Sequence, residues 1–330
     1  MDYKKIFDPQ EHGGDHPLAC CFDDASNIPQ RGDERTGRVY RYTEELVLAI
    51  NVALATSRPL LLKGPSGCGK SSMARNLARA LDARFYEYVV TSRSQAQDLQ
   101  WRFDTVRRLA DAQVKKELDE HQAYIEPGPL WWIFSPETAK RRGCKAIKDG
   151  ASVVCDPAIL AKENCKRSVL LIDEIDKADP DFANNLLVPI GSYQFTVAET
   201  NFTVKLEKSE ENPWDQIPLV IITSNNERIL PDAFERRCIL YNLPPADTKT
   251  LVEIANLSFP KGDQTFPAKL AAFIEADMQR DLERDTEISC SIPQFLDAVH
   301  AFHHLFGPQQ VDFPAEQMKR IMTRILEKNA

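Results

Sequence analysis

A glycine-rich stretch with a lysine and three serines, GPSGCGKSS at residues 64–72, has the composition and spacing of a phosphate-binding loop. A chain of phosphates must be wrapped by backbone N–H groups, and glycine lets the backbone come close enough to do this. The ammonium group of Lys70 can reach the terminal phosphates, and the hydroxyl of Ser71 can bind Mg²⁺. The candidate phosphate-binding residues are Gly64, Pro65, Ser66, Gly67, Cys68, Gly69, Lys70, Ser71 and Ser72.

The residues on either side of this loop predict the strand and the helix that such a loop requires. Residues 60–62 are three leucines, an apolar run typical of a buried strand. After the loop, Ala74, Leu77, Ala78 and Leu81 recur at the spacing of one helix face. The alternative is a tight turn that happens to carry a lysine, but strand, loop and helix in this order favour a true nucleotide site.

A pair of carboxylates, Asp173 and Glu174, follows the apolar residues 169–172. A continuous apolar run predicts a strand that is buried on both faces, as in a parallel sheet covered by helices. Carboxylates at the carboxyl end of such a strand lie where open α/β sheets bind ligands. We expect Asp173 to hold Mg²⁺ through water, and Glu174 to orient or activate the water that attacks the γ-phosphate.

An amide and two guanidinium groups complete the candidate chemistry. Asn225 follows a further apolar run, in the segment 218–226, and at the tip of a neighbouring strand it can share the attacking water with Glu174. Arg236 and Arg237 precede the β-rich residues 238–241. Guanidinium groups placed there suit a finger that stabilises the transferring phosphate on a neighbouring subunit, and the alternative is surface salt bridging. The candidate catalytic residues are Glu174, Asn225, Arg236 and Arg237.

The composition restricts the classes of protein to consider. The chain has 330 residues and a formal net charge of −8, with a pI near 5.4. This charge argues against a surface that binds nucleic acid everywhere, although it permits a local basic groove. No apolar run is long enough for a membrane span, and the N-terminus lacks the apolar core of a signal peptide. We therefore expect a cytoplasmic protein of one large and one smaller domain, with reduced cysteines.

Other segments predict the elements that position these groups. Residues up to about 38 show little periodicity and predict an irregular leader. Apolar residues after Thr43 have helical spacing, and residues 84–90 alternate as a strand does. A long charged helix is predicted to follow, because Leu99, Phe103 and Val106 recur at helical spacing in a stretch that ends near residue 121.

Taken in order along the chain, these residues resemble the AAA+ ATPases. Residues 64–71 match the Walker A motif, and residues 169–174 match Walker B. Residues 223–225 are similar to sensor 1, and residues 232–237 resemble the arginine-finger box. The resemblance covers nearly everything from Tyr40 onward.

Within that superfamily the chain resembles the MoxR-type ATPases. The similarity lies in the segment Pro-Gly-Pro-Leu at 127–130, in the hairpin-like residues 193–206 and in an extended helical insert near residues 94–123. In many relatives a lid arginine contacts the γ-phosphate after a Ser-Pro-like segment. Here Gln294 stands at that place, which puts lid-coupled hydrolysis in question or assigns it to another residue.

The resemblance implies an α/β fold of three layers, αβα, with a parallel sheet in strand order 5-1-4-3-2 and a C-terminal helical lid. It implies an irregular leader at residues 1–39, a nucleotide-binding domain at 40–243 and the lid at 244–330. It also implies homo-oligomeric rings, commonly of six subunits, with ATP bound between subunits. Tyr40 and Tyr42 lie where relatives contact the base, although ordinary packing explains them equally well.

The leading hypothesis is a Mg²⁺-dependent ATPase that remodels or assembles a protein partner, often in this family one with a von Willebrand factor A-type domain. One alternative is an ATP-dependent switch or scaffold in a bacterial conflict or defence system, with slow turnover. Another is a nucleic-acid-linked motor, against which the acidic pI argues. A small-molecule kinase explains the phosphate loop, but leaves Asn225, the arginine pair and the lid without a role.

Overall fold

The computed structural model describes residues 5–11, 17–22, 36–114, 121–144, 154–160, 165, 167–207, 217–260, 264–282, 290–307 and 313–326. The chain divides into two compact units. Unit 1 comprises Met1–Phe7, Glu45–Lys63 and Leu77–Tyr241, and unit 2 comprises Asp8–Glu44, Gly64–Asn76 and Asn242–Ala330. The division into leader, nucleotide-binding domain and lid at residues 39/40 and 243/244 remains a proposal.

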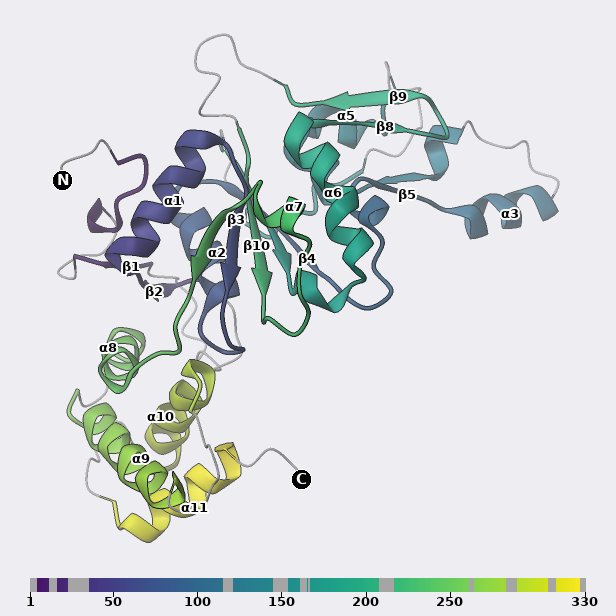
Figure 1. The fold of residues 1–330 in the computed structure, drawn as a ribbon. Helices are drawn as coiled ribbons and strands as arrows, with labels where there is room; N and C mark the ends of the chain where they lie inside the picture. Colours follow the sequence, from purple (N-terminus) through teal and green to yellow (C-terminus); the bar gives the residue numbers. More distant parts are fainter. Residues whose placement is uncertain are drawn as a thin grey trace. The chain divides into compact units, whose positions relative to one another are not determined.

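Unit 1 contains a five-stranded sheet (Figure 1). Its strands, in spatial order, are β11 (Ile239–Asn242), β3 (Leu60–Lys63), β10 (Leu219–Ser224), β7 (Ser168–Asp173) and β4 (Arg84–Val89). The pairs β3–β10, β10–β7 and β7–β4 are parallel. In terms of these five strands alone, the order is 5-1-4-3-2, so the predicted fold class and the five predicted strands are confirmed.

The central strand β10 and its neighbour β7 are buried because helices flank the sheet. Every residue of β10 is buried, and β7 is buried from Val169 to Asp173. Helices that share the apolar core with the sheet include α4 (Pro129–Phe134), α5 (Pro136–Lys140) and α6 (Pro180–Ser192). Helices α1 (Glu44–Thr56) and α2 (Lys70–Ala80) begin near the residues where the sequence predicts them.

The segment Pro-Gly-Pro-Leu at 127–130 requires a glycine because its backbone lies close to the backbone of Leu99. Gly128 precedes the first turn of α4, where Pro129 starts the helix with a suitable φ angle. A Cβ atom at Gly128 would lie 2.5 Å from the carbonyl carbon and oxygen of Leu99. Only glycine fits this position, so the 3-10 helix η2 (Ala96–Leu99) can lie directly against the start of α4.

Two hairpin-like pairs lie beside this core. Strands β8 (Gln194–Val197) and β9 (Phe202–Lys205) pair antiparallel, which confirms the predicted hairpin between the acidic strand and β10. The region near residues 94–123 differs from the predicted long helix. After η2 it forms β5 (Trp101–Phe103), α3 (Thr105–Gln113), η3 (His121–Tyr124) and β6 (Ile125–Pro127).

The predicted long helix was wrong because local hydrogen bonds divide the segment. Strand β5 pairs antiparallel with β6, and the Asp104 side chain accepts the N–H of Arg107 at 2.8 Å, which starts a new helix. Val106 is 78% exposed, whereas the Arg107 guanidinium lies over the Tyr124 ring, 5.6 Å from its centroid. The apolar residues at helical spacing therefore lie in different elements and do not form one stripe.

Unit 2 contains the C-terminal helices and a short strand pair. Helices α8 (Thr248–Ser258), α9 (Phe266–Leu282), α10 (Ile292–Phe306) and α11 (Ala315–Leu326) share an apolar core, which confirms the expected C-terminal helical region. Strand β1 (Ala19–Cys21) pairs antiparallel with β2 (Val39–Arg41). Of the predicted leader, residues 1–4, 12–16 and 23–35 lie outside the described residues.

None of the helices in the described ranges combines the length and the apolar character needed to span a bilayer.

We expect Gly128→Ala to lower the free energy of unfolding by about 1–3 kcal/mol, because the added methyl group collides with rigid backbone. Urea unfolding at constant m-value measures this change. Gly191→Ala is the matched control, because a Cβ atom there meets nothing within 4 Å and α6 gains a better helix former. The control should unfold at the same or a slightly higher urea concentration. A wild-type midpoint for Gly128→Ala would contradict the close approach.

Candidate nucleotide site

Asp173 ends β7, the second strand from one edge of the sheet, and is buried with 1% of its surface exposed. The hydroxyl of Thr223, on the neighbouring strand β10, donates to Asp173 Oδ1 at 2.5 Å. A hydrogen bond to a buried carboxylate offsets part of the cost of removing its charge from water. The parallel pairing of β7 and β10 therefore holds the side chain of Asp173, the predicted metal ligand, in a fixed position.

Glu174 leaves the strand in the left-handed conformation, with φ 60° and ψ 49°. Its N–H donates to Thr223 Oγ1 at 2.8 Å. For a residue other than glycine this conformation costs about 1–2 kcal/mol, and such strain clusters at functional sites. Because of this turn, the chain leaves the direction of β7 at Glu174. The carboxylates of Asp173 and Glu174 therefore take up different positions.

The two oxygen atoms of the Glu174 carboxylate have different partners. Asn225 Nδ2 donates to Oε1 at 3.2 Å, and Lys177 Nζ donates to Oε2 at 2.5 Å. The structure therefore brings together the predicted base and the predicted sensor amide. The contact with Lys177 was not predicted. The hydrogen bond from that ammonium to Glu174 raises the pKa of Lys177 and keeps it charged.

Asp176 is a second residue that sequence reasoning missed. Its side chain is 1% exposed, and its Oδ2 accepts the N–H groups of Asn225 and Glu227, both at 2.9 Å. These bonds fix the loop after β10 and thereby hold Asn225 beside Glu174. In the sequence Asp176 belongs to the run Asp-Lys-Ala-Asp, which contains no sign of this contact with residues some fifty positions later.

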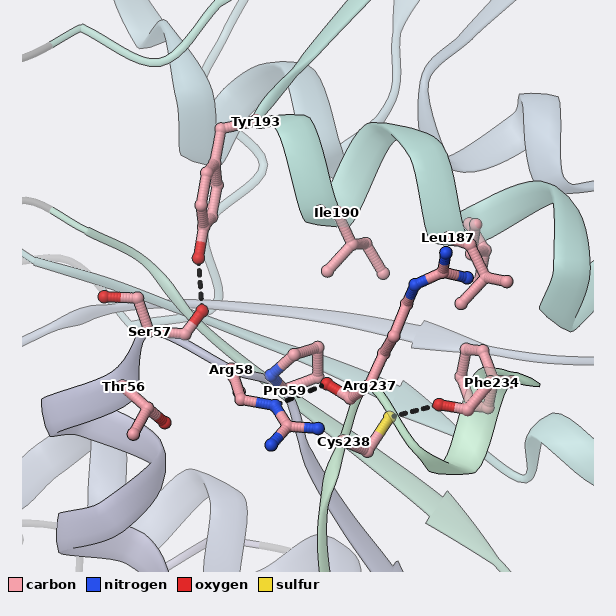
Figure 2. Close-up of a pocket in the computed structure, with 12 residues that line it drawn as sticks. Thr56, Ser57, Arg58, Pro59, Leu187, Ile190, Tyr193, Phe234, Arg237 and Cys238 are labelled. Carbon is pink, nitrogen blue, oxygen red and sulfur yellow. Dashed lines mark hydrogen bonds between the residues drawn. The ribbon is translucent and has the colours of Figure 1, made fainter. Parts of the chain in front are cut away.

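Arg236 and Arg237 follow the short helix α7 (Asp232–Glu235), and both are exposed. Within the described ranges no hydrogen bond or ion pair of either side chain is found. Their main-chain carbonyl oxygens accept hydrogen bonds from Arg58, which precedes β3. Figure 2 shows the bond to Arg237. Arg58 is a third residue that the sequence did not single out.

The phosphate loop belongs to unit 2 and is shaped by positive φ angles at its glycines. Gly67 has φ 77° and Gly69 has φ 94°, values that other residues rarely adopt. Lys70 is 6% exposed, and its ammonium group donates to the carbonyl oxygens of Gly64 and Pro65, each at 2.8 Å. The predicted loop residues thus form a compact turn around their own lysine. Pro65 and Ser66 are exposed, and Ser71 and Ser72 are half-buried.

Cys68 lies inside the same loop with 7% of its surface exposed. Burial raises the pKa of the Cys68 thiol, and the nearby Lys70 only partly opposes this effect. Since the thiolate is the reactive form, the thiol is poorly suited to oxidation. Tyr42 is also a packing residue, because it is fully buried and donates its hydroxyl to Asn76 Oδ1 at 2.8 Å.

The start of α10 lies against the phosphate loop within unit 2. A Cβ atom at Gly67 would lie 2.6 Å from Cβ of Ser291, and the N–H of Ile292 donates to the Gly67 carbonyl at 3.3 Å. Gln294, at the place of the lid arginine, caps this helix: its Oε1 accepts from the N–H of Ser291 at 3.0 Å and from the Ser291 hydroxyl at 2.8 Å. Gln294 therefore has a structural role.

We expect Thr223→Val to lower the free energy of unfolding by about 1–3 kcal/mol. Valine has the same shape, but it removes the donor to Asp173 and the acceptor of the Glu174 N–H. Thr196→Val is the matched control, since Thr196 is exposed on β8 and bonds only to the exposed Thr203. Equal urea midpoints for the two variants would contradict the structural weight given to the Thr223 hydroxyl.

Known proteins resemble the chain at low sequence identity. Shikimate kinases of Shewanella pealeana and Shewanella woodyi are each 29% identical to the chain over 124 residues, which cover 36% of this chain and 72% of theirs. The RuvB Holliday junction branch migration motor of Thermotoga maritima aligns with a TM-score of 0.44 and 13% identity, over 85% of this chain and 67% of RuvB. A mutant of that RuvB aligns with a TM-score of 0.48 and 14% identity, over 90% and 73%.

A family model gives the assignment. The model of the AAA domain, dynein-related subfamily, matches residues 59–238, which include the phosphate loop, the acidic pair, Asn225 and the arginine pair. This match covers more than half of the 330 residues. The chain belongs to the AAA domain family, in its dynein-related subfamily.

Proposed function

We propose that the protein binds ATP with Mg²⁺ and hydrolyses it at interfaces between subunits of a ring, and that it uses this energy to remodel or assemble a protein partner. The observation that carries the proposal is the contact between Glu174 and Asn225, which come from neighbouring strands of the sheet. Membership of the AAA domain family supports nucleotide binding and hydrolysis as the general activity.

In the proposed mechanism each residue has a separate task. The backbone of residues 64–72 binds the phosphates, and Lys70 exchanges its loop carbonyls for phosphate oxygens. Glu174 accepts a proton from the attacking water, which Asn225 helps to orient. Both oxygens of Glu174 are engaged in this structure, so the contact with Lys177 must loosen before Glu174 acts as a base.

The oxygen donors present suit Mg²⁺. The carboxylate of Asp173 and the hydroxyl of Ser71 are hard oxygen ligands of the kind that this ion prefers. When bound, Mg²⁺ neutralises charge on the β- and γ-phosphates. We assign no further residue to the ion.

The arginine pair supports shared sites in a ring. Two exposed guanidinium groups without partners in the described part of unit 1 suit phosphate on a neighbouring subunit. We propose a ring of six, of MoxR type and located in the cytoplasm. The partner is a protein, with a von Willebrand factor A-type domain as the first candidate. Phosphoryl transfer to a small molecule leaves Asn225 and the arginine pair without a role, so we favour hydrolysis.

A slowly hydrolysing switch or scaffold is the second candidate. Two observations favour it: Gln294 is engaged as a helix cap where relatives place a lid arginine, and Lys177 neutralises the carboxylate of Glu174. In this version ATP binding drives assembly, and turnover resets it. Both candidate functions use the same nucleotide site. They differ in how fast ATP is hydrolysed once the subunits have assembled.

We expect ATP turnover per chain to rise with protein concentration and then reach a plateau, because each site needs a neighbour. Glu174→Gln should lower the plateau by about 100-fold or more while ATP still binds, since it removes the base. Glu126→Gln, an exposed position on β6, is the control and should match the wild type.

Three outcomes separate the alternatives. Undiminished turnover in Glu174→Gln would overturn the mechanism. ATP-dependent assembly with almost no turnover in the wild type would favour the switch. Turnover that does not change with protein concentration would contradict shared sites.

A further inference from the structure

We propose that Arg58 is a positioning residue for the arginine pair, holding the backbone of Arg236 and Arg237 so that their side chains project in a fixed direction. This inference rests on the proposed function, in which the pair stabilises the transferring phosphate. Arg58 itself lies outside every motif that the sequence suggests, and its side chain donates to the main-chain carbonyls of the pair.

The position of Arg58 is set by the elements on both sides of it. It follows α1, and its N–H donates to the carbonyl of Ala53 at 3.2 Å. Ser57 reverses the chain with φ 56°, and Pro59 restricts the backbone on the other side. The carbonyl of Pro59 accepts the N–H of Ile239 at 2.8 Å, which joins the start of β3 to the start of β11. The guanidinium of Arg58 therefore starts from a fixed backbone.

Arg58 binds the carbonyl groups that follow the last turn of α7. Its Nε donates to the carbonyl of Arg237 at 3.1 Å (Figure 2). Its Nη2 donates to the carbonyl of Arg236. Carbonyls at the end of a helix have no partner within the helix. A planar fork with two donors can bind two adjacent carbonyls at once, which a lysine ammonium cannot do in the same geometry.

In the described part of unit 1, neither guanidinium of the pair has a hydrogen bond or an ion pair of its own. Arg237 lines a pocket with a volume of 430 Å³, together with Leu187 and Ile190 of α6 (Figure 2). Arg237 is exposed in spite of this pocket, and no hydrogen bond or ion pair of its guanidinium is found in the described part of unit 1. The direction in which the guanidinium projects therefore depends on the backbone that carries it.

A second contact ties the same corner to β3. Lys63, the last residue of β3, forms an ion pair of 2.5 Å with Glu235, the residue before Arg236. Burial of Phe234 and Cys238 fixes the chain on either side of the pair. The N–H groups of Arg236 and Arg237 donate to the carbonyls of Asp232 and Phe234, each at 3.0 Å. Arg58 adds a side chain from another element, which binds the carbonyl groups of both residues.

The test compares Arg58→Lys and Arg58→Ala with the wild type, using the full chain. We expect turnover at saturating ATP to fall about 10- to 100-fold in both variants, because a small misplacement of a catalytic group has effects of this size. The affinity for ATP should stay within about 2-fold of the wild type, since the phosphate loop is intact. Arg141→Lys is the control, because Arg141 is exposed at the end of α5. The turnover of this variant should equal that of the wild type.

Mixed oligomers separate positioning from stability. Arg58→Lys chains have an intact phosphate loop, and Lys70→Ala chains have an intact Arg58 and arginine pair. Each should be nearly inactive alone, and mixing them should restore turnover, because the second chain offers its arginines to the site of the first. A purely structural loss would lower the melting temperature of Arg58→Lys and would not be rescued by mixing.

The outcomes distinguish this inference from the proposed function. If Arg236→Ala and Arg237→Ala impair turnover but Arg58→Lys and Arg58→Ala do not, the positioning role is overturned while the proposed function stands. If neither arginine variant of the pair changes turnover, the role of the pair fails and that of Arg58 fails with it. Turnover that falls only in proportion to the folded fraction of an Arg58 variant also overturns the positioning role.

Discussion

The hydroxyl group of Thr223 joins the two strands that carry the candidate chemistry. It donates to the carboxylate of Asp173 and accepts from the backbone N–H of Glu174, so one oxygen atom binds two consecutive residues. This is possible because β10 runs parallel to β7 with Ile222 beside Ile172, which brings the ends of both strands to the same level. The left-handed turn at Glu174 and the approach of Asn225 follow from that shared end. The sheet therefore contributes geometry to the site that no single motif contains.

The sheet and the main motifs could be predicted because local patterns determine them. Four or more apolar residues followed by a polar end predict a buried parallel strand, as in residues 169–174 and 218–226, and glycine spacing predicts a phosphate loop. The strand order came from the resemblance, since no local rule says that the acidic strand lies between β4 and β10. Asn225 was predicted beside Glu174 by this route, and the two side chains are in contact.

The remaining contacts could not be predicted because they join residues far apart in the chain. Arg58 binds carbonyls nearly two hundred positions later, and Asp176 binds the loop at Asn225, and neither type of contact leaves a trace in spacing. The predicted helix over the insert failed for another reason. Helical spacing of apolar residues persists by chance through Phe103, but the capping side chain of Asp104 and the pairing of β5 with β6 decide the local structure.

The contact between Gly67 and the start of α10 has a thermodynamic consequence. The Gly67 carbonyl accepts from Ile292, and the loop leaves no room for even a methyl group beside Ser291. Any ligand that alters the shape of the loop must change the free energy of this contact. By reciprocity, a force or a partner that displaces α10 changes the affinity of the loop for that ligand by the same factor. Displacement of α10 and binding of a ligand to the loop are therefore energetically coupled through the contact at Gly67.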